Sequence, residues 1–116
     1  MATYRELTSL NELEEALQAS HQQTVLFFKH SNTCPISARA FGEFEKYLQT
    51  EASANLQHVL IVVQKAREAS DRLEALTGVQ HESPQVILVR NGKAVWDDSH
   101  FSLRSAAIAQ AAGAHA

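Results

Sequence analysis

The sequence predicts an α/β fold in which helices flank a central mixed sheet, and three observations support this prediction. Apolar runs at residues 25–28 and 59–63 lack polar alternation, which is typical of strands buried on both faces. These runs alternate with segments whose apolar residues recur at helical spacing. Asn91-Gly92 is a hairpin signal and predicts an antiparallel strand pair near the C-terminus. We expect the 116 residues to form one domain over residues 1–116.

The first predicted elements are a strand from Tyr4 to Leu7 and a helix from Leu10 to Ala19. A Ser-x-x-Glu pattern that begins at Ser9 resembles a capping box and marks the start of this helix. A polar connection then leads into a strand from Thr24 to Lys29, whose apolar run suggests a central position in the sheet.

A polar loop follows that strand and carries the only cysteine of the chain, Cys34. Pro35 fits the first turn of a helix, where its missing N–H costs no hydrogen bond. The spacing of Phe41, Phe44 and Leu48 predicts a helix from Pro35 to Glu51 that has Ser37 on the same face.

The second half of the chain continues the alternation of strands and helices. The predicted elements are a strand at His58–Val63, a helix at Arg67–Thr77, strands at Gln85–Arg90 and Lys93–Asp97, and a helix at Ser102–Ala112. Gly78 stands where a left-handed helix cap is expected, and we expect the tail from Gly113 to be frayed.

The predicted order is therefore βαβαβαββα. The early strands that helices connect should be parallel, with right-handed crossovers, and the last hairpin should be antiparallel. This order, with a cysteine at the start of the second helix, is the pattern of a thioredoxin-like domain.

Composition limits the classes of partner and compartment. The formal net charge is −3 and no basic stripe is present, which argues against nucleic acid as a partner. No apolar run approaches the roughly 18 residues that a membrane helix needs, and we see no signal peptide. One cysteine excludes an intramolecular disulfide, so we expect a reducing cytoplasm. The oligomeric state stays open.

Cys34 is the predicted catalytic residue. It follows a polar loop and stands at a helix N-terminus, where unpaired N–H groups and the helix dipole favour a thiolate. A buried structural cysteine is the alternative interpretation, because free cysteines are commonly buried.

The residues from Thr33 to Ser37 form the predicted active-site loop, which includes Pro35 and Ile36. Its Cys-x-x-Ser spacing places Ser37 where dithiol oxidoreductases have a second cysteine. Serine does not resolve a mixed disulfide, so the remaining chemistry is monothiol exchange with an outside thiol. Alternatively, Ser37 is a helix residue that hydrogen-bonds its own first turn.

Pro84 precedes a predicted buried strand, and in thioredoxin-like folds a cis-proline at this point packs beside the catalytic cysteine. We expect Pro84 to be cis and Ser83 to offer backbone hydrogen bonds to a substrate. His30 and His81 bracket the loops that should meet at the site, and either could tune Cys34. The alternative for both is an ordinary loop histidine.

Other chemistries find little support in the sequence. No cluster of histidine, cysteine and acidic residues has metal-ligand spacing, so we expect no metal. Nothing indicates the base and oxyanion hole of a cysteine hydrolase. Trp96 is expected to pack against the core or the sheet edge, and Ser99-His100 to cap the last helix or form a partner-contacting rim.

Two motifs resemble those of the monothiol bacilliredoxins, the family of the general stress protein YtxJ. The first is Phe28-Lys29-His30-Ser31-Asn32-Thr33-Cys34-Pro35-Ile36-Ser37, which is similar to the family's Phe-Lys-His-Ser-x-Thr-Cys-Pro-Ile-Ser signature. The second is Gly78-Val79-Gln80-His81-Glu82-Ser83-Pro84-Gln85, which is similar to the segment around the family's cis-proline. The resemblance extends to Asn91-Gly92-Lys93 and the stretch from Trp96 to His100, so it spans nearly the whole chain.

The resemblance implies a thioredoxin-like fold and removal of bacillithiol from protein mixed disulfides in a bacterial cytoplasm. Cys34 would be the attacking thiolate, and Ser83 and Pro84 would shape the substrate groove. No cofactor would be bound, and bacillithiol would be the co-substrate. The partners would be bacillithiolated client proteins and a low-molecular-weight thiol, which must be another small thiol if the host makes no bacillithiol.

Two alternative functions stay open at the level of sequence. The domain could be a non-catalytic adaptor or redox sensor that binds a partner at the cis-proline groove. It could also be a glutaredoxin-like enzyme that works with glutathione.

Overall fold

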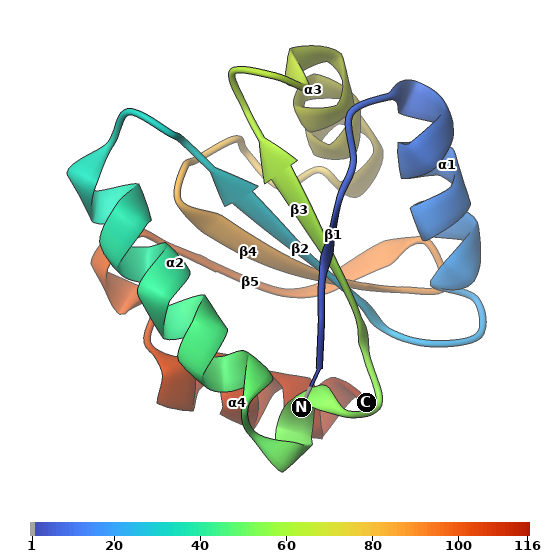
Figure 1. Cartoon of the computed structure of the whole chain (residues 1–116). Helices are drawn as coiled ribbons and strands as arrows, with labels where there is room; N and C mark the ends of the chain where they lie inside the picture. The colour runs from blue at the N-terminus through green and yellow to red at the C-terminus, as the bar shows by residue number, and fades with distance from the viewer. Residues whose placement is uncertain (1) are drawn as a thin grey trace.

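The computed structural model describes residues 2–116 and has a five-stranded mixed sheet with helices on both faces, which confirms the predicted thioredoxin-like fold class (Figure 1). The strands are β1 (Arg5–Glu6), β2 (Val25–His30), β3 (Gln57–Val62), β4 (Gln85–Arg90) and β5 (Lys93–Ser99). The helices are α1 (Leu10–Ala19), α2 (Pro35–Leu48), α3 (Arg67–Thr77) and α4 (Ser105–His115), with 3₁₀ turns η1 (Glu51–Ser53) and η2 (His100–Ser102). Within residues 2–116, no helix is long and apolar enough to cross a membrane.

The sheet order is β1-β3-β2-β4-β5. β1, β3 and β2 are parallel, whereas β4 runs antiparallel to β2 and β5 antiparallel to β4. In the register, His30 lies opposite Val62 and Lys29 lies opposite Gln85. The ends of β2 and β3 and the start of β4 therefore meet at one edge of the sheet.

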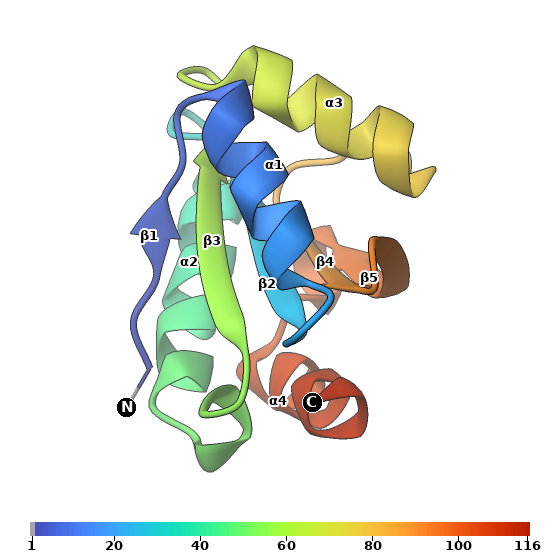
Figure 2. The same cartoon turned by 90° about the vertical axis from the view of Figure 1, so that its right-hand side faces the viewer.

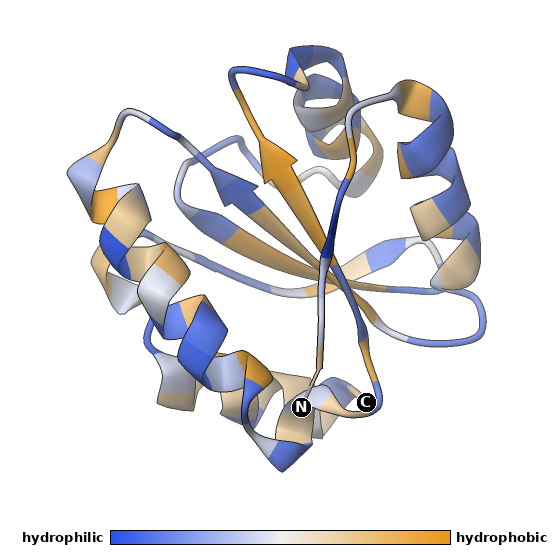
Figure 3. Ribbon diagram, in the orientation of Figure 1, coloured by the Kyte–Doolittle hydropathy of each residue, from blue (hydrophilic) through white to orange (hydrophobic). Residues whose placement is uncertain are grey.

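The sheet separates two apolar cores. Phe28 and Leu88 pack with α2 and α4 on one face, and Phe27 and Ile87 pack with α1 and α3 on the other (Figures 1 and 2). Neighbouring residues of β2 thus serve opposite cores, because successive strand side chains alternate between faces. Figure 3 shows the hydrophobic colour concentrated in the inner strands, whereas the end of β2 is hydrophilic.

Several predicted signals form as expected. The Ser9 Oγ accepts the N–H of Glu12 at 3.2 Å and caps α1, while the Glu12 carboxylate accepts the N–H of Thr8. Gly78 closes α3 with a φ of 73°, a conformation that glycine adopts without a Cβ penalty. Asn91 and Gly92 both have positive φ, as a two-residue hairpin turn requires.

The second helix is shorter than predicted. It ends at Leu48 instead of Glu51, and the 3₁₀ turn η1 follows it. The Thr50 hydroxyl donates to the Tyr47 carbonyl at 2.7 Å, and the Ser53 hydroxyl donates to the Leu48 carbonyl at 3.1 Å. These side chains satisfy carbonyls that a longer helix would pair with backbone N–H groups.

The C-terminal region also differs from the prediction. β5 continues to Ser99, and the last helix begins at Ser105 instead of Ser102. It runs through the predicted frayed tail to His115, whose carbonyl accepts the hydroxyl of Thr24. Thr24, the residue just before β2, therefore holds the C-terminal end of α4. Such a contact between distant residues is not visible in the local sequence.

Candidate active site

Cys34 lies in the loop between β2 and α2 and occupies the N-cap position of α2, with φ −103° and ψ 121°. Pro35 is the first residue of the helix, as predicted. The cysteine is half-buried, and its sulfur makes no hydrogen bond to the first turn. N–H groups at a helix start have no partners within the helix, so they face the position where a thiolate would form.

Ser37 is fully buried, and its contacts differ from the predicted alternative of a bond within its own turn. Its Oγ accepts the backbone N–H of Ser31 at 3.0 Å and lies 2.8 Å from the Nδ1 of His30. The hydroxyl proton is thus free to be donated to a neutral His30 ring. The residue at the expected resolving position therefore closes the loop that presents Cys34.

His30 joins this arrangement from the end of β2. Burial lowers the pKa of His30, and the carboxylate of Glu6 opposes that effect in part. The imidazole packs against the Phe41 ring, with centroids 5.2 Å apart. Burial therefore favours the neutral ring of His30, which contacts the loop through Ser37.

Gln64 is a site residue that the sequence analysis missed. Its Oε1 accepts the N–H of Asn32 at 3.1 Å, and its Nε2 donates to the hydroxyls of Ser31 and Thr33 at 2.8 and 3.3 Å. One amide side chain thus holds three consecutive residues of the loop before Cys34. The sequence did indicate that Gln64 follows a strand. Because the carboxyl ends of neighbouring parallel strands share one edge of the sheet, this position places Gln64 near the Cys34 loop.

The segment before β4 reaches the same edge. The Ser83–Pro84 peptide bond is cis, as predicted, and Pro84 is buried while Ser83 is half-buried. The register that places Gln85 opposite Lys29 brings this segment beside the loop that leaves β2.

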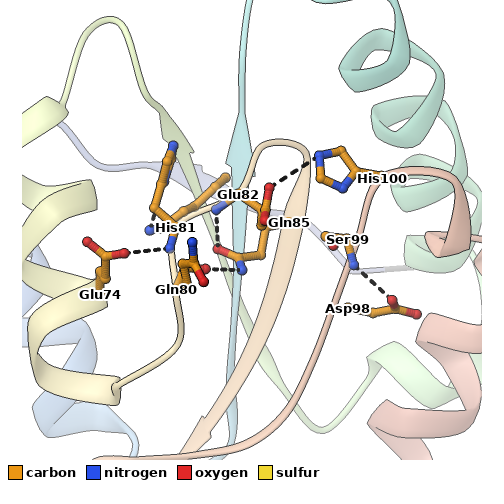
Figure 4. A network of polar contacts seen from close by, with 9 residues as sticks. Glu74, Gln80, His81, Glu82, Gln85, Asp98, Ser99 and His100 are labelled. Atoms are coloured by element: carbon orange, nitrogen blue, oxygen red, sulfur yellow. Dashed lines mark hydrogen bonds and ion pairs between the residues drawn. The ribbon is translucent and has the colours of Figure 1, made fainter.

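Polar contacts from three parts of the chain fix the segment (Figure 4). The N–H of His81 donates to the Glu74 carboxylate at 2.6 Å, which joins the segment to α3. The buried Gln85 side chain donates to the Gln80 carbonyl at 2.9 Å, and the N–H of His100 donates to the Pro84 carbonyl at 3.0 Å. These contacts hold the segment at which the sequence predicts a substrate groove.

His100 and Trp96 lie after β4, where His100 contacts the cis-proline segment and Trp96 contacts the core. The predicted cap of the last helix is wrong, because Arg104 is the N-cap of α4. His100 instead supports Pro84, and its ring lies 3.4 Å from the Glu82 carboxylate. Trp96 packs against the core cluster of α2 and α4, as expected.

Within residues 2–116, no histidine forms a hydrogen bond with Cys34. Among the residues that the structure describes, the Nδ1 of His81 contacts the Nζ of Lys29 at 3.3 Å instead. Tuning of Cys34 by His30 or His81 stays a prediction: His30 contacts Ser37 in the Cys34 loop, and His81 lies at the start of the cis-proline segment.

The arrangement supports exchange chemistry at the sulfur of one half-buried cysteine. Residues 2–116 contain no group of three histidine, cysteine or acidic side chains placed to hold a metal ion. An open cavity of about 520 Å³ lies between the starts of α1 and α3, and Gln64 lines it while Cys34 does not. The Cys34 loop and the cis-proline segment therefore lie together at one edge of the sheet, outside that cavity.

Comparison with known proteins agrees with this geometry. The family described as monothiol bacilliredoxin BrxC matches residues 5–108. A candidate oxidoreductase with a thioredoxin fold is 34% identical, with a TM-score of 0.81 over 93% of this chain and 92% of its own.

Two thioredoxins show the fold alone at lower identity. The Malassezia sympodialis thioredoxin is 13% identical, with a TM-score of 0.80 over 99% of this chain and 92% of its own. The Fasciola hepatica thioredoxin is also 13% identical, with a TM-score of 0.75 over 97% and 99%.

The family match covers most of the chain, and the cysteine, the serine three residues later and the cis-proline all lie at one edge of a thioredoxin-like sheet. The chain therefore belongs to the monothiol bacilliredoxin family of thiol oxidoreductases.

Proposed function

We propose that this chain removes bacillithiol from mixed disulfides of client proteins. The observation that carries the proposal is the Cys34 site itself. A half-buried cysteine occupies the N-cap position of α2, while the position of a resolving thiol holds a buried serine hydroxyl. This arrangement favours exchange with one sulfur and leaves the second step to an external thiol.

The reaction is two thiol–disulfide exchanges. The Cys34 thiolate attacks the bacillithiol sulfur of the mixed disulfide, a new S–S bond forms to Cys34, and the client leaves as a thiolate that takes up a proton. A second thiol, as its thiolate, then attacks the bacillithiol sulfur on Cys34, which releases a small disulfide and restores the Cys34 thiolate. No net electron change occurs on the enzyme over the cycle.

The other site residues prepare this attack. Ser37 and Gln64 hold the loop from its two sides, and each relies on hydrogen bonds of 3.1 Å or shorter to its backbone N–H groups. Ser83 and Pro84 offer the extended groove in which the client chain would lie. A reducing cytoplasm would keep Cys34 available as a thiol.

The test compares two clients that differ only in the attached thiol, bacillithiol or glutathione, and follows release of the free client. We expect faster release from the bacillithiolated client, and none with the Cys34→Ser variant. Preference for the glutathionylated client would favour a glutaredoxin-like enzyme. No release from either client, with Cys34 accessible to alkylation, would contradict catalysis and favour an adaptor that binds at the cis-proline groove.

A further inference from the structure

Lys29 is a fully buried lysine in the central strand of the sheet. Its side chain points to the face of β2 opposite Phe28, toward the core that α1 and α3 cover. Its Nζ donates to the Ser70 carbonyl of α3 at 3.1 Å and contacts the Nδ1 of His81 at 3.3 Å. Both partners are neutral groups, and within residues 2–116 no carboxylate lies within 4.0 Å of this ammonium.

A buried ammonium without a paired carboxylate destabilises a fold, because its lost hydration is not fully replaced. Burial lowers the pKa of Lys29, while the carboxylates of Glu74 and Asp71 oppose this effect from a longer distance. An unbranched apolar side chain would fill the same space without this penalty. Packing alone therefore does not explain a lysine here.

The contact with His81 gives Lys29 a connection to the proposed groove. His81 is held at two points, since its N–H donates to Glu74 and its ring nitrogen faces both Lys29 and the Ser70 hydroxyl at 3.3 Å. Only Glu82 and Ser83 separate His81 from Pro84. The ring of His81 is thus the point at which a buried side chain of β2 contacts the cis-proline segment.

We propose that Lys29 is a positioning residue for substrate: by donating to the Nδ1 of His81, it holds residues 81–84 against α3 in the shape that binds the mixed disulfide. This inference rests on the proposed function, because it concerns the groove that the client would use. It assigns no direct contact between Lys29 and Cys34.

The contact depends on the protonation of His81. A neutral ring accepts a hydrogen bond at Nδ1, whereas a protonated ring would face the ammonium as a second cation. Lys29 on β2 and Arg67 on α3 disfavour the protonated ring, and Glu74 and Asp71 on α3 favour it. Burial and Lys29 together lower the pKa of His81. Acid should therefore loosen the groove as His81 takes up a proton.

The main test replaces Lys29 with methionine and uses the exposed Lys93→Met variant as a matched control. For Lys29→Met we expect unfolding by urea at equal or higher concentration, and a roughly tenfold lower kcat/KM for the bacillithiolated client, mainly through KM. Alkylation of Cys34 by a small reagent should keep its wild-type rate, since such a reagent does not use the groove.

Histidine ring NMR tests the contact without any turnover. Since Lys29 lowers the pKa of His81, Lys29→Met should shift the His81 titration to higher pH, and Lys93→Met should leave it unchanged. A wild-type KM or an unshifted titration in Lys29→Met would overturn the proposal. If no wild-type turnover is seen, the proposed function fails on its own, and the titration still decides on the contact.

A second variant covers the case in which Lys29→Met does not fold. His81→Gln keeps an oxygen acceptor for Lys29 but does not titrate. We expect the pH profile of its kcat/KM to lack the acid limb that protonation of His81 contributes in the wild type. An acid limb identical to that of the wild type would overturn the proposal.

Discussion

Acid should destabilise this protein through His58, a buried residue of β3 that is 4% exposed. Its Nε2 lies 2.8 Å from the hydroxyl of Tyr47 on α2. Burial lowers the pKa of His58 to about 4, although a backbone hydrogen bond with Thr3 opposes the shift. An unfolded histidine titrates near 6.5, so the unfolded chain binds a proton between these values and the folded chain does not.

This difference in proton binding sets the sign and the size of the pH effect on the free energy of unfolding. Above pH 6.5 His58 is neutral in both states and contributes no pH dependence. As the pH falls toward 4, protonation of the unfolded state lowers the free energy of unfolding, by about 2 kcal/mol at pH 5 and about 3 kcal/mol at pH 4 and below. Losses of this size are a large share of the stability of a small domain.

The assay is urea unfolding of the wild type and of His58→Gln at pH 8 and at pH 5. Glutamine keeps a polar partner for Tyr47 but has no proton to gain, while all other titrating groups are common to both proteins. We expect the wild type to lose about 2 kcal/mol more than the variant between these pH values. An equal loss in both proteins would refute the assignment to His58.

Three further substitutions test the site and the fold. Gln64→Ala should slow Cys34-dependent client release roughly tenfold in single-turnover kinetics, since it frees three loop residues, whereas the exposed Gln18→Ala should not; equal rates would show that the loop needs no clamp. In the Ser37→Cys variant, the new thiol should displace bacillithiol from Cys34 and form an internal disulfide. Its intact mass should then be two hydrogens below that of the reduced variant, and a retained bacillithiol adduct would contradict this. Gly78→Ala should lower the free energy of unfolding by about 1 kcal/mol, because alanine is strained at its φ of 73°, while Gly113→Ala inside α4 should not be destabilising.

The fold was predictable where the signal is local. The apolar runs of β2 and β3, the cap at Ser9 and the turn at Asn91-Gly92 each specify their element within a few residues. The order of strands and helices indicated a thioredoxin-like domain, and that fold implied a cis-proline at Pro84 near the Cys34 loop. These features needed no knowledge of side-chain contacts between distant segments.

The remaining features depend on such contacts. In the sequence, Lys29 is only the last residue of a predicted apolar strand. The register against β4 and the position of α3 are needed to show that its side chain reaches His81. The Thr24 contact that holds the last helix joins residues 91 positions apart. Gln64 is the intermediate case, because its place after β3 was visible in the sequence while its three hydrogen bonds were not.

The most direct test of the central claim is the intact mass of the protein after one equivalent of bacillithiolated client, followed by peptide mapping. We predict a gain of one bacillithiol on the peptide that contains Cys34, with an equal amount of free client. An unmodified Cys34 alongside an intact mixed disulfide would contradict the assignment of Cys34 as the nucleophile that accepts bacillithiol.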